Sequence, residues 1–162
     1  MEILPENDFQ IRRLSTKFYS AYDGKNYPEI LAKNNRSYNC LLFETHYDYF
    51  ICVPFRSEIK HPYSFRFKKS KRSQSHKSGL DYQKIVIIEN LDYLDDGVAI
   101  VDKDEYREAI SNIEKIKRDA LHFVEDYVKY WKNDKKSLSN EEFNRRYKWS
   151  SLQYFHLERG IK

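Results

Sequence analysis

The chain has 162 residues, of which 40% are hydrophobic and 33% charged, with only four Gly and four Pro. This length allows one domain with a real hydrophobic core, and the composition excludes a disordered or collagen-like chain. The longest apolar runs have the length of strands, and the first six residues carry two acids where a signal peptide requires a basic segment. We therefore expect a single cytoplasmic domain over residues 1–162, with no membrane segment.

Positive charge is concentrated in one part of the chain. The net charge is +4, yet residues 59–80 contain seven Lys or Arg and no Asp or Glu, so the rest of the chain carries −3. Such a concentration predicts an anionic partner, which is RNA, DNA or an acidic membrane surface. The alternative is a solvated loop that only aids solubility. The absence of any acid in this segment favours nucleic acid.

The first half of the chain is predicted to form short strands and short helices. Helical pieces are expected at residues 15–22 and 28–33. Strands are expected at 9–14, 38–44, 49–55 and 63–68, the second and third being joined by a hairpin at 45–48.

The second half begins with a basic loop at 69–77, followed by a strand at 83–89 and a short strand at 98–101. Apolar residues then recur at threes and fours from Tyr106 to Trp131, which predicts an amphipathic helix of about eight turns. Asp102 and Glu105 form a plausible capping pair at its start, and Ser139 with Glu142 repeats that signature before a final helix.

Together these elements predict an α+β domain, in which a curved antiparallel sheet or open barrel packs against a long C-terminal helix. Cys40 and Cys52 lie in neighbouring apolar runs and are expected to be buried thiols. A hairpin between the two runs also allows them to come close, so a disulfide under oxidation stays open. The five histidines are scattered without metal-ligand spacing, and no phosphate-binding glycine loop is present, so no metal or cofactor is expected.

The segment that suggests chemistry follows directly on the strand at 49–55 and contains Arg56, Ser57, Lys60 and His61. RNA is cut without metal when its own 2′-hydroxyl attacks the adjacent phosphorus, and an enzyme then moves protons and stabilises phosphoryl charge. Histidine as a residue type exchanges protons near neutral pH, so His61 is the candidate acid or base, while Arg56 and Lys60 offer donors to the phosphate. Ser57 is a candidate to hydrogen-bond the phosphate or to orient the nucleophile. The structural alternative is an ordinary polar turn.

A second polar cluster closes the basic loop at residues 76–82. Lys77 and Ser78 are candidates to contact phosphate, with Asp81 orienting a histidine or capping a turn. Ser, Gly and Asp are also common turn formers before a strand, and that alternative stays open. The residues predicted to bind RNA are Arg66, Lys68, Lys69, Lys71, Arg72, His76, Lys77 and Ser78.

At these two clusters the chain resembles the toxins of type III toxin–antitoxin systems, specifically the CptN/TenpN branch, which is related to ToxN and AbiQ. The first cluster reads Pro54-Phe55-Arg56-Ser57-x-Ile59-x-His61, followed by Phe65 and Phe67. The second reads Lys77-Ser78-Gly79-Leu80-Asp81-Tyr82-x-Lys84-x-Val86-Ile87-Ile88. Asp104-Glu105-Tyr106 follows at the start of the long helix.

The resemblance implies a curved antiparallel β-core with surrounding helices and a metal-independent endoribonuclease that leaves 2′,3′-cyclic phosphate and 5′-hydroxyl ends. It also implies processing of a repetitive precursor into small pseudoknotted RNAs, which inhibit the toxin in a closed heteromeric assembly and protect the bacterium against phage. Ser57 corresponds to a serine of ToxN-like members. Arg56 stands where that branch has threonine, and the lysine spacing differs, so the roles in that branch do not transfer directly.

Two non-enzymatic functions are compatible with the same residues. A non-catalytic RNA- or DNA-binding module would use the basic segment without cutting, and an interaction domain for an acidic protein would show no RNA preference. Only the enzyme hypothesis predicts that His61→Ala spares binding while abolishing cleavage.

Overall fold

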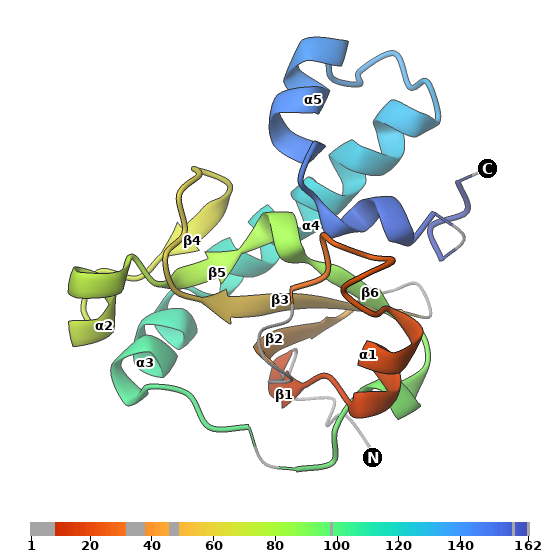
Figure 1. Ribbon diagram of the computed structural model, residues 1–162. Helices are drawn as coiled ribbons and strands as arrows, with labels where there is room; N and C mark the ends of the chain where they lie inside the picture. The colour runs from red at the N-terminus through yellow and green to blue at the C-terminus, as the bar shows by residue number, and fades with distance from the viewer. Residues whose placement is uncertain (1–8, 32–37, 46–48, 98, 157, 162) are drawn as a thin grey trace.

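The computed structural model describes residues 9–31, 38–45, 49–97, 99–156 and 158–161. Within these ranges the chain forms an α+β fold, in which helices surround one open sheet of six antiparallel strands (Figure 1). The predicted α+β class, with an antiparallel sheet and a long helix, is therefore confirmed. In the same ranges no helix combines the length and the apolar character needed to cross a bilayer.

The sheet is organised around β3 (Phe50–Arg56), whose five inner residues are buried. One edge of β3 pairs with β2 (Asn39–Glu44), and β2 pairs in turn with β1 (Phe9–Arg13). Two strands share the other edge of β3. β6 (Val86–Ile88) pairs with the first three residues of β3. The last two residues of β3 are thus left for another strand, and the candidate catalytic segment begins there.

A group of short elements extends from this end of β3. β5 (Gly79–Asp81) pairs with the last two residues of β3 and also with β4 (Ser64–Arg66). Between β4 and β5 the chain forms α2 (Lys71–His76), with the Ser70 side chain accepting a capping hydrogen bond. The prediction of an irregular loop at residues 69–77 is therefore wrong for Lys71–His76, which are helical. None of the residues of α2 is buried. The helix therefore has no apolar face, and the sequence shows no helical spacing of apolar residues there.

The predicted helix of about eight turns is divided into α3 (Lys103–Ser111) and α4 (Ile113–Trp131). The division falls at Asn112, whose φ of −119° and ψ of 19° are not helical. Asp102 caps α3 as predicted, because its carboxylate accepts hydrogen bonds from two amides of the first turn. Ser139 likewise caps the final helix α5 (Asn140–Tyr147).

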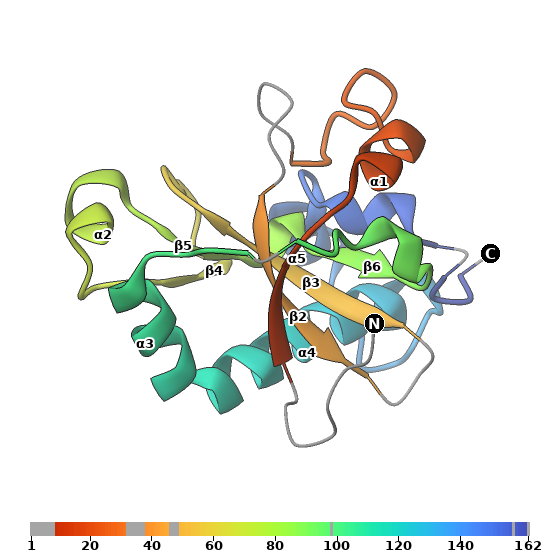
Figure 2. The same cartoon turned by 90° about the horizontal axis from the view of Figure 1, so that it is seen from below.

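Helices cover both faces of the sheet. α1 (Thr16–Ala21), capped by Ser15, and α4 lie on opposite sides of it, as two views at right angles show (Figures 1 and 2). α4 buries an apolar stripe that includes Phe123 and Val124, while α1 buries Phe18. Three short 3-10 helices complete the described elements: η1 (Tyr82–Lys84), η2 (Leu91–Tyr93) and η3 (Ser151–Tyr154).

Three other predicted elements differ in the structure. Residues 28–30 form turns instead of a helix, since so short a segment gains too few hydrogen bonds to offset helix nucleation. Residues 99–101 form no strand, and the strand predicted at 83–89 is shortened to β6 by the preceding 3-10 helix. Residues 32–33, 46–48 and 98, on which parts of these predictions fall, lie outside the described residues.

The two cysteines are buried and free, as core thiols are. The register of β2 and β3 places Cys40 opposite Pro54 and Cys52 opposite Leu42, so the two thiols are diagonal neighbours without a disulfide. Burial raises the pKa of Cys40 to about 12 and that of Cys52 well above its ordinary value. Both thiols therefore stay protonated and unreactive at neutral pH.

Candidate functional site

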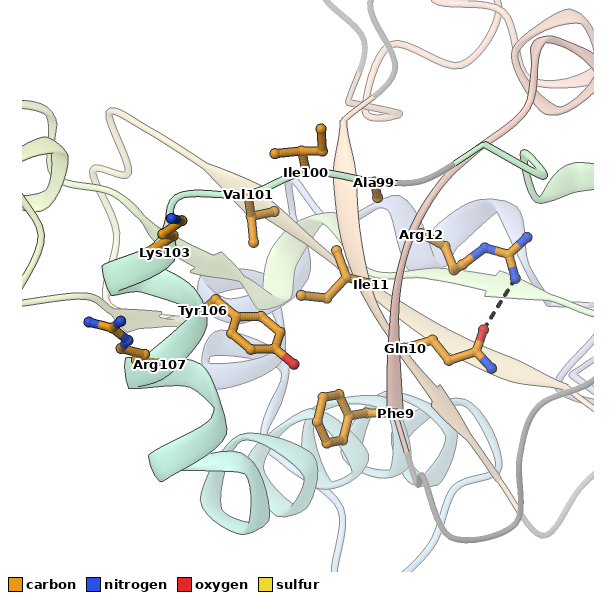
Figure 3. A pocket seen from close by; sticks show the side chains of 10 residues that line it. All are labelled: Phe9, Gln10, Ile11, Arg12, Ala99, Ile100, Val101, Lys103, Tyr106 and Arg107. Atoms are coloured by element: carbon orange, nitrogen blue, oxygen red, sulfur yellow. Dashed lines mark hydrogen bonds between the residues drawn. The ribbon is translucent and has the colours of Figure 1, made fainter.

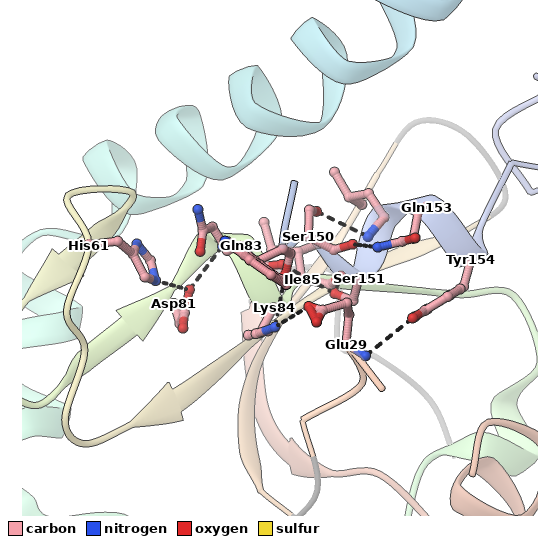
Figure 4. Close-up of polar contacts among 12 residues, drawn as sticks. Glu29, His61, Asp81, Gln83, Lys84, Ile85, Ser150, Ser151, Gln153 and Tyr154 are labelled. Atoms are coloured by element: carbon pink, nitrogen blue, oxygen red, sulfur yellow. Dashed lines mark hydrogen bonds and ion pairs between the residues drawn. The ribbon is translucent and has the colours of Figure 1, made fainter. Parts of the chain in front are cut away.

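Arg56 and His61, two residues predicted to be catalytic, meet at the carboxylate of Asp81. Figure 4 shows the His61 side of this contact. Arg56 ends β3, Asp81 ends β5, and His61 lies in the connection between β3 and β4. Nη1 of Arg56 donates to Oδ2 of Asp81 at 2.8 Å, and Nε2 of His61 lies 3.0 Å from Oδ1. The side chain of Asp81 is fully buried, whereas those of Arg56 and His61 are 31% and 19% exposed. A buried anion thus holds two partly exposed basic groups.

The charge of Asp81 is stabilised by its partners. Burial by itself raises the pKa of this carboxyl, but His61 and Arg56 more than offset it and hold the pKa below its ordinary value. The carboxylate also accepts a hydrogen bond of 3.0 Å from the amide of Gln83. Asp81 is therefore ionised at neutral pH and can fix the position of the Arg56 guanidinium.

The ring of His61 is held on both sides. Its Nδ1 accepts a hydrogen bond of 3.1 Å from the amide of Tyr63. Although Nε2 is close to Asp81, it is buried without a well-aligned hydrogen bond. The ring of Tyr63 stacks on that of His61 at a centroid distance of 6.0 Å. His61 therefore exchanges a proton only after its ring releases one of these contacts.

The loop that carries Ser57 and Lys60 is attached to the end of α2. The amide of Ile59 donates to the carbonyl of Lys77 at 3.2 Å, and the Ile59 side chain is fully buried. Glu58 adopts a left-handed conformation with φ of 57°. This geometry leaves Ser57 half-buried and Lys60 exposed. Both lie close to residues 66–78, which hold the candidate RNA-binding residues and are called the basic segment below.

Glu105 of α3 anchors the basic segment through hydrogen bonds to its side chains. The sequence had not predicted this role for Glu105. Its carboxylate is 1% exposed and accepts hydrogen bonds from the hydroxyls of Ser70, at 3.0 Å, and Ser78, at 2.7 Å. These two serines flank α2, so one buried carboxylate fixes both ends of this helix. Arg72, on α2 itself, places Nη1 at 3.7 Å from the same carboxylate.

Glu108, one turn further along α3, is 6% exposed and accepts hydrogen bonds from the amides of Lys68 and Lys69 at 2.9 to 3.1 Å. The 105/108 spacing places both acids on one side of the helix. The sequence did hold a signal for this anchoring role. The two acids lie on the same face of the predicted amphipathic helix as some of its apolar residues. The backbone of Lys68 and Lys69 is thereby fixed while their side chains stay exposed.

The residues predicted to bind RNA differ in their exposure. Those with exposed side chains are Lys68, Lys69, Lys71, His76 and Lys77. Arg66 is half-buried and donates to the hydroxyl of Ser64, and the imidazole of His76 lies 3.0 Å from Glu58. Ser78 is fully buried on Glu105, so its hydroxyl is not available to a phosphate in this structure.

Gly79 and Lys84, both in the second stretch that carries the resemblance, have structural contacts. A Cβ at Gly79 would lie 2.3 Å from the carbonyl oxygen of Phe65, so only glycine fits between β3 and β4. Nζ of Lys84 donates to the carbonyl of Trp149 at 2.8 Å and to Glu29 at 3.2 Å (Figure 4). Lys84 therefore joins the C-terminal part of the chain to the segment between β5 and β6.

Among the described residues, no group of three or more His, Cys, Asp or Glu side chains is arranged to hold a metal ion. The chain matched no model of a known protein family, no curated protein and no solved structure.

Proposed function

We propose that this protein is a metal-independent endoribonuclease, the toxin of a type III toxin–antitoxin system, with the fold of that family. The observation that carries the proposal is the contact of Arg56 and His61 with buried Asp81, beside Ser57 and an exposed cationic segment. The sequence resemblance supplies the class of toxin. In support of the proposal, the guanidinium of Arg56 is held by Asp81 and is partly exposed, so it could receive a phosphate.

The reaction needs only the RNA itself. The 2′-oxygen bonds to the adjacent phosphorus, and the bond from phosphorus to the 5′-oxygen breaks, giving a 2′,3′-cyclic phosphate and a 5′-hydroxyl. One proton leaves the 2′-hydroxyl and one reaches the 5′-oxygen, so protons balance. In this scheme Arg56 and Lys60 stabilise charge on the phosphoryl oxygens, and Ser57 hydrogen-bonds the phosphate. His61 transfers a proton once its ring has released the Tyr63 amide.

The proposed partners are cellular RNA, as substrate, and a small pseudoknotted RNA cut from a repetitive precursor, as antitoxin. Folded RNA carries dense negative charge, and the exposed lysines of residues 68–77 provide the complementary surface. In the proposed assembly several copies of protein and RNA alternate, and the antitoxin covers the site around Arg56. The system acts in phage defence in the bacterial cytoplasm.

One observation favours a second candidate function, a nucleic-acid-binding module without catalysis. Both ring nitrogens of His61 face protein groups, Tyr63 on one side and Asp81 on the other. Such a ring stabilises the loop between β3 and β4 without any chemistry. Binding would then use the same exposed lysines.

The two candidates are separated by incubating purified, RNA-free protein with mixed RNA in excess EDTA and mapping the ends. The proposal expects discrete cuts that end in cyclic phosphate. His61→Ala and Ser57→Ala should abolish the cuts, and Lys135→Gln, an exposed site between α4 and α5, should not. RNA that is bound but intact would establish the binding module instead.

A further inference from the structure

A groove of about 750 Å³ lies between the outer side of β1, residues 99–101 and the first turns of α3 (Figure 3). We name it the β1–α3 groove. Its apolar lining includes Phe9 and Ile11 of β1, both half-buried, and Tyr106 of α3, which is 41% exposed. Ile100, at 81% exposure, is the most exposed large apolar side chain among the described residues. These side chains leave apolar surface in contact with solvent inside a concave site of ordinary ligand-binding size.

Among the described residues, the charged side chains that line the groove are all cationic: Arg12, Lys103 and Arg107. Arg12 is already engaged, because its guanidinium donates to Gln10 and to the carbonyl of Asp95. Among the described residues, Arg107 pairs with Asp104 at a distance of 3.9 Å, and the side chains of Arg107 and Asp104 are 77% and 55% exposed. Lys103 and Arg107 are therefore positioned to receive an anionic ligand from solvent.

The walls of the groove are fixed by specific contacts. The side-chain amide of Asn39 donates to the carbonyl of Ile100 at 2.7 Å, which holds the segment opposite α3. α3 itself is anchored through Glu105 and Glu108, which point to the basic segment on its other side. One short helix thus separates the cations of the groove from the exposed lysines beside the candidate active site.

We propose that the β1–α3 groove binds an unpaired nucleotide of single-stranded RNA. The base packs against Tyr106 and the apolar floor, and the flanking phosphates contact Lys103 and Arg107. Aromatic and apolar surface combined with cations, without carboxylates, is the chemistry that suits a base and its phosphates. The identity of the ligand rests on the proposed function, and the groove extends the RNA path from the candidate active site across α3.

The test measures binding of a fluorescein-labelled hexaribonucleotide by the full chain, using 2′-O-methyl residues so that 2′-hydroxyl attack cannot occur. Tyr106→Ala should weaken binding about tenfold, as loss of one stacked base does, while Tyr106→Phe keeps the ring and should bind like the parent protein. Lys103→Gln with Arg107→Gln should weaken binding and flatten its salt dependence. Lys135→Gln with Lys136→Gln removes the same charge from the exposed turn between α4 and α5 and should do neither.

Thermal denaturation of each variant checks that the fold is kept. Groove variants that bind like the parent protein would overturn the inference and leave the proposed ribonuclease intact. Binding at the groove without cleavage of ordinary RNA would instead overturn the ribonuclease and keep the groove. A dimer that Ile100→Asp dissociates would show that a second copy covers the groove, which also overturns the inference.

Discussion

At the scale of single residues, Asp81 decides how the candidate site is built. It touches both Arg56 and His61 while being fully buried, so it positions these residues and does not itself reach a substrate. A buried carboxylate is costly unless its partners compensate it, and here two basic groups and one amide do so. In return, the positions of the Arg56 and His61 side chains depend on their contacts with Asp81.

Asp81→Asn should therefore remove most of the RNA cleavage while leaving RNA binding largely intact. The amide keeps the shape of the side chain but lacks the charge that fixes the Arg56 guanidinium, so Arg56 loses its preferred position. A loss of about 100-fold in kcat, with little change in KM, is expected from misplacing a group that stabilises charge. Measuring both constants decides the point, since an equal loss in affinity would mean that Asp81 only maintains the fold.

At the scale of elements, α3 lies between the two surfaces proposed to bind RNA. One side of this helix presents Glu105 and Glu108 to the basic segment, and the other side lines the β1–α3 groove. The acids neutralise part of a segment that would otherwise repel itself. They also fix its backbone, so that exposed lysines are held at defined positions rather than on a free loop.

Glu105→Ala should lower the free energy of unfolding by about 1–3 kcal/mol, because the hydroxyls of Ser70 and Ser78 are buried and would lose their acceptor. Glu105→Gln keeps an acceptor and should cost less. Chemical denaturation measures both changes, and hydrogen exchange should locate the loosened amides in α2. An unchanged exchange rate there would contradict the role of Glu105.

The contact between α4 and the chain after η3 should make stability depend on pH. The hydroxyl of Tyr127 hydrogen-bonds Nε2 of His156, and burial raises the pKa of Tyr127 to about 12, so the tyrosine keeps its proton and donates it. Burial lowers the pKa of His156 below its ordinary value of 6.5. The unfolded chain therefore binds more protons than the folded one below pH 6.5, and stability falls there as pH decreases.

Melting temperatures at pH 7.5 and pH 5.0 test this contact. The drop between the two should be smaller in His156→Gln, which keeps an acceptor for Tyr127 without a titratable ring. His122→Gln, at an exposed position of α4, serves as the control and should behave like the parent protein. An equal drop in all three proteins would assign the pH dependence to other groups.

At the scale of the whole molecule, the charge is polarised. The segment that includes α2 and its flanks carries cations alone, while α3 contributes buried acids beneath it. Exposed like charges on one side of a protein attract a polyanion over a distance set by salt. Association with RNA should therefore be fast and strongly dependent on ionic strength.

Replacing Lys68, Lys69 and Lys71 by Gln should weaken RNA binding and reduce the slope of log K against log salt by up to about 2. Each phosphate contact on a single strand contributes about 0.7 to that slope. Arg72 is left out because it lies near Glu105, and its loss would also disturb the fold. Titrations at several salt concentrations give the slope, and a slope equal to that of the parent protein would remove this segment from the RNA interface.

Local rules account for what the sequence alone determined. Alternating and continuous apolar runs predicted β1, β2 and β3, and capping residues located the starts of α3 and α5, because these signals depend on near neighbours in the chain. The clustering of Arg56, Ser57, Lys60 and His61 was visible for the same reason. Short elements without an apolar face, α2 above all, were missed because only their tertiary anchors stabilise them.

Only the tertiary structure decided which polar residues face solvent and which are structural. Ser78 looked like a phosphate ligand and is buried on Glu105, while Asp81 binds groups 20 and 25 positions away. These partners lie on separate elements, and pairing them requires the sheet order that brings β5 beside the end of β3. The sequence shows composition and the period of apolar residues. Burial and long-range hydrogen bonds exist only once the chain has folded. They determine which polar side chains are left to contact a ligand.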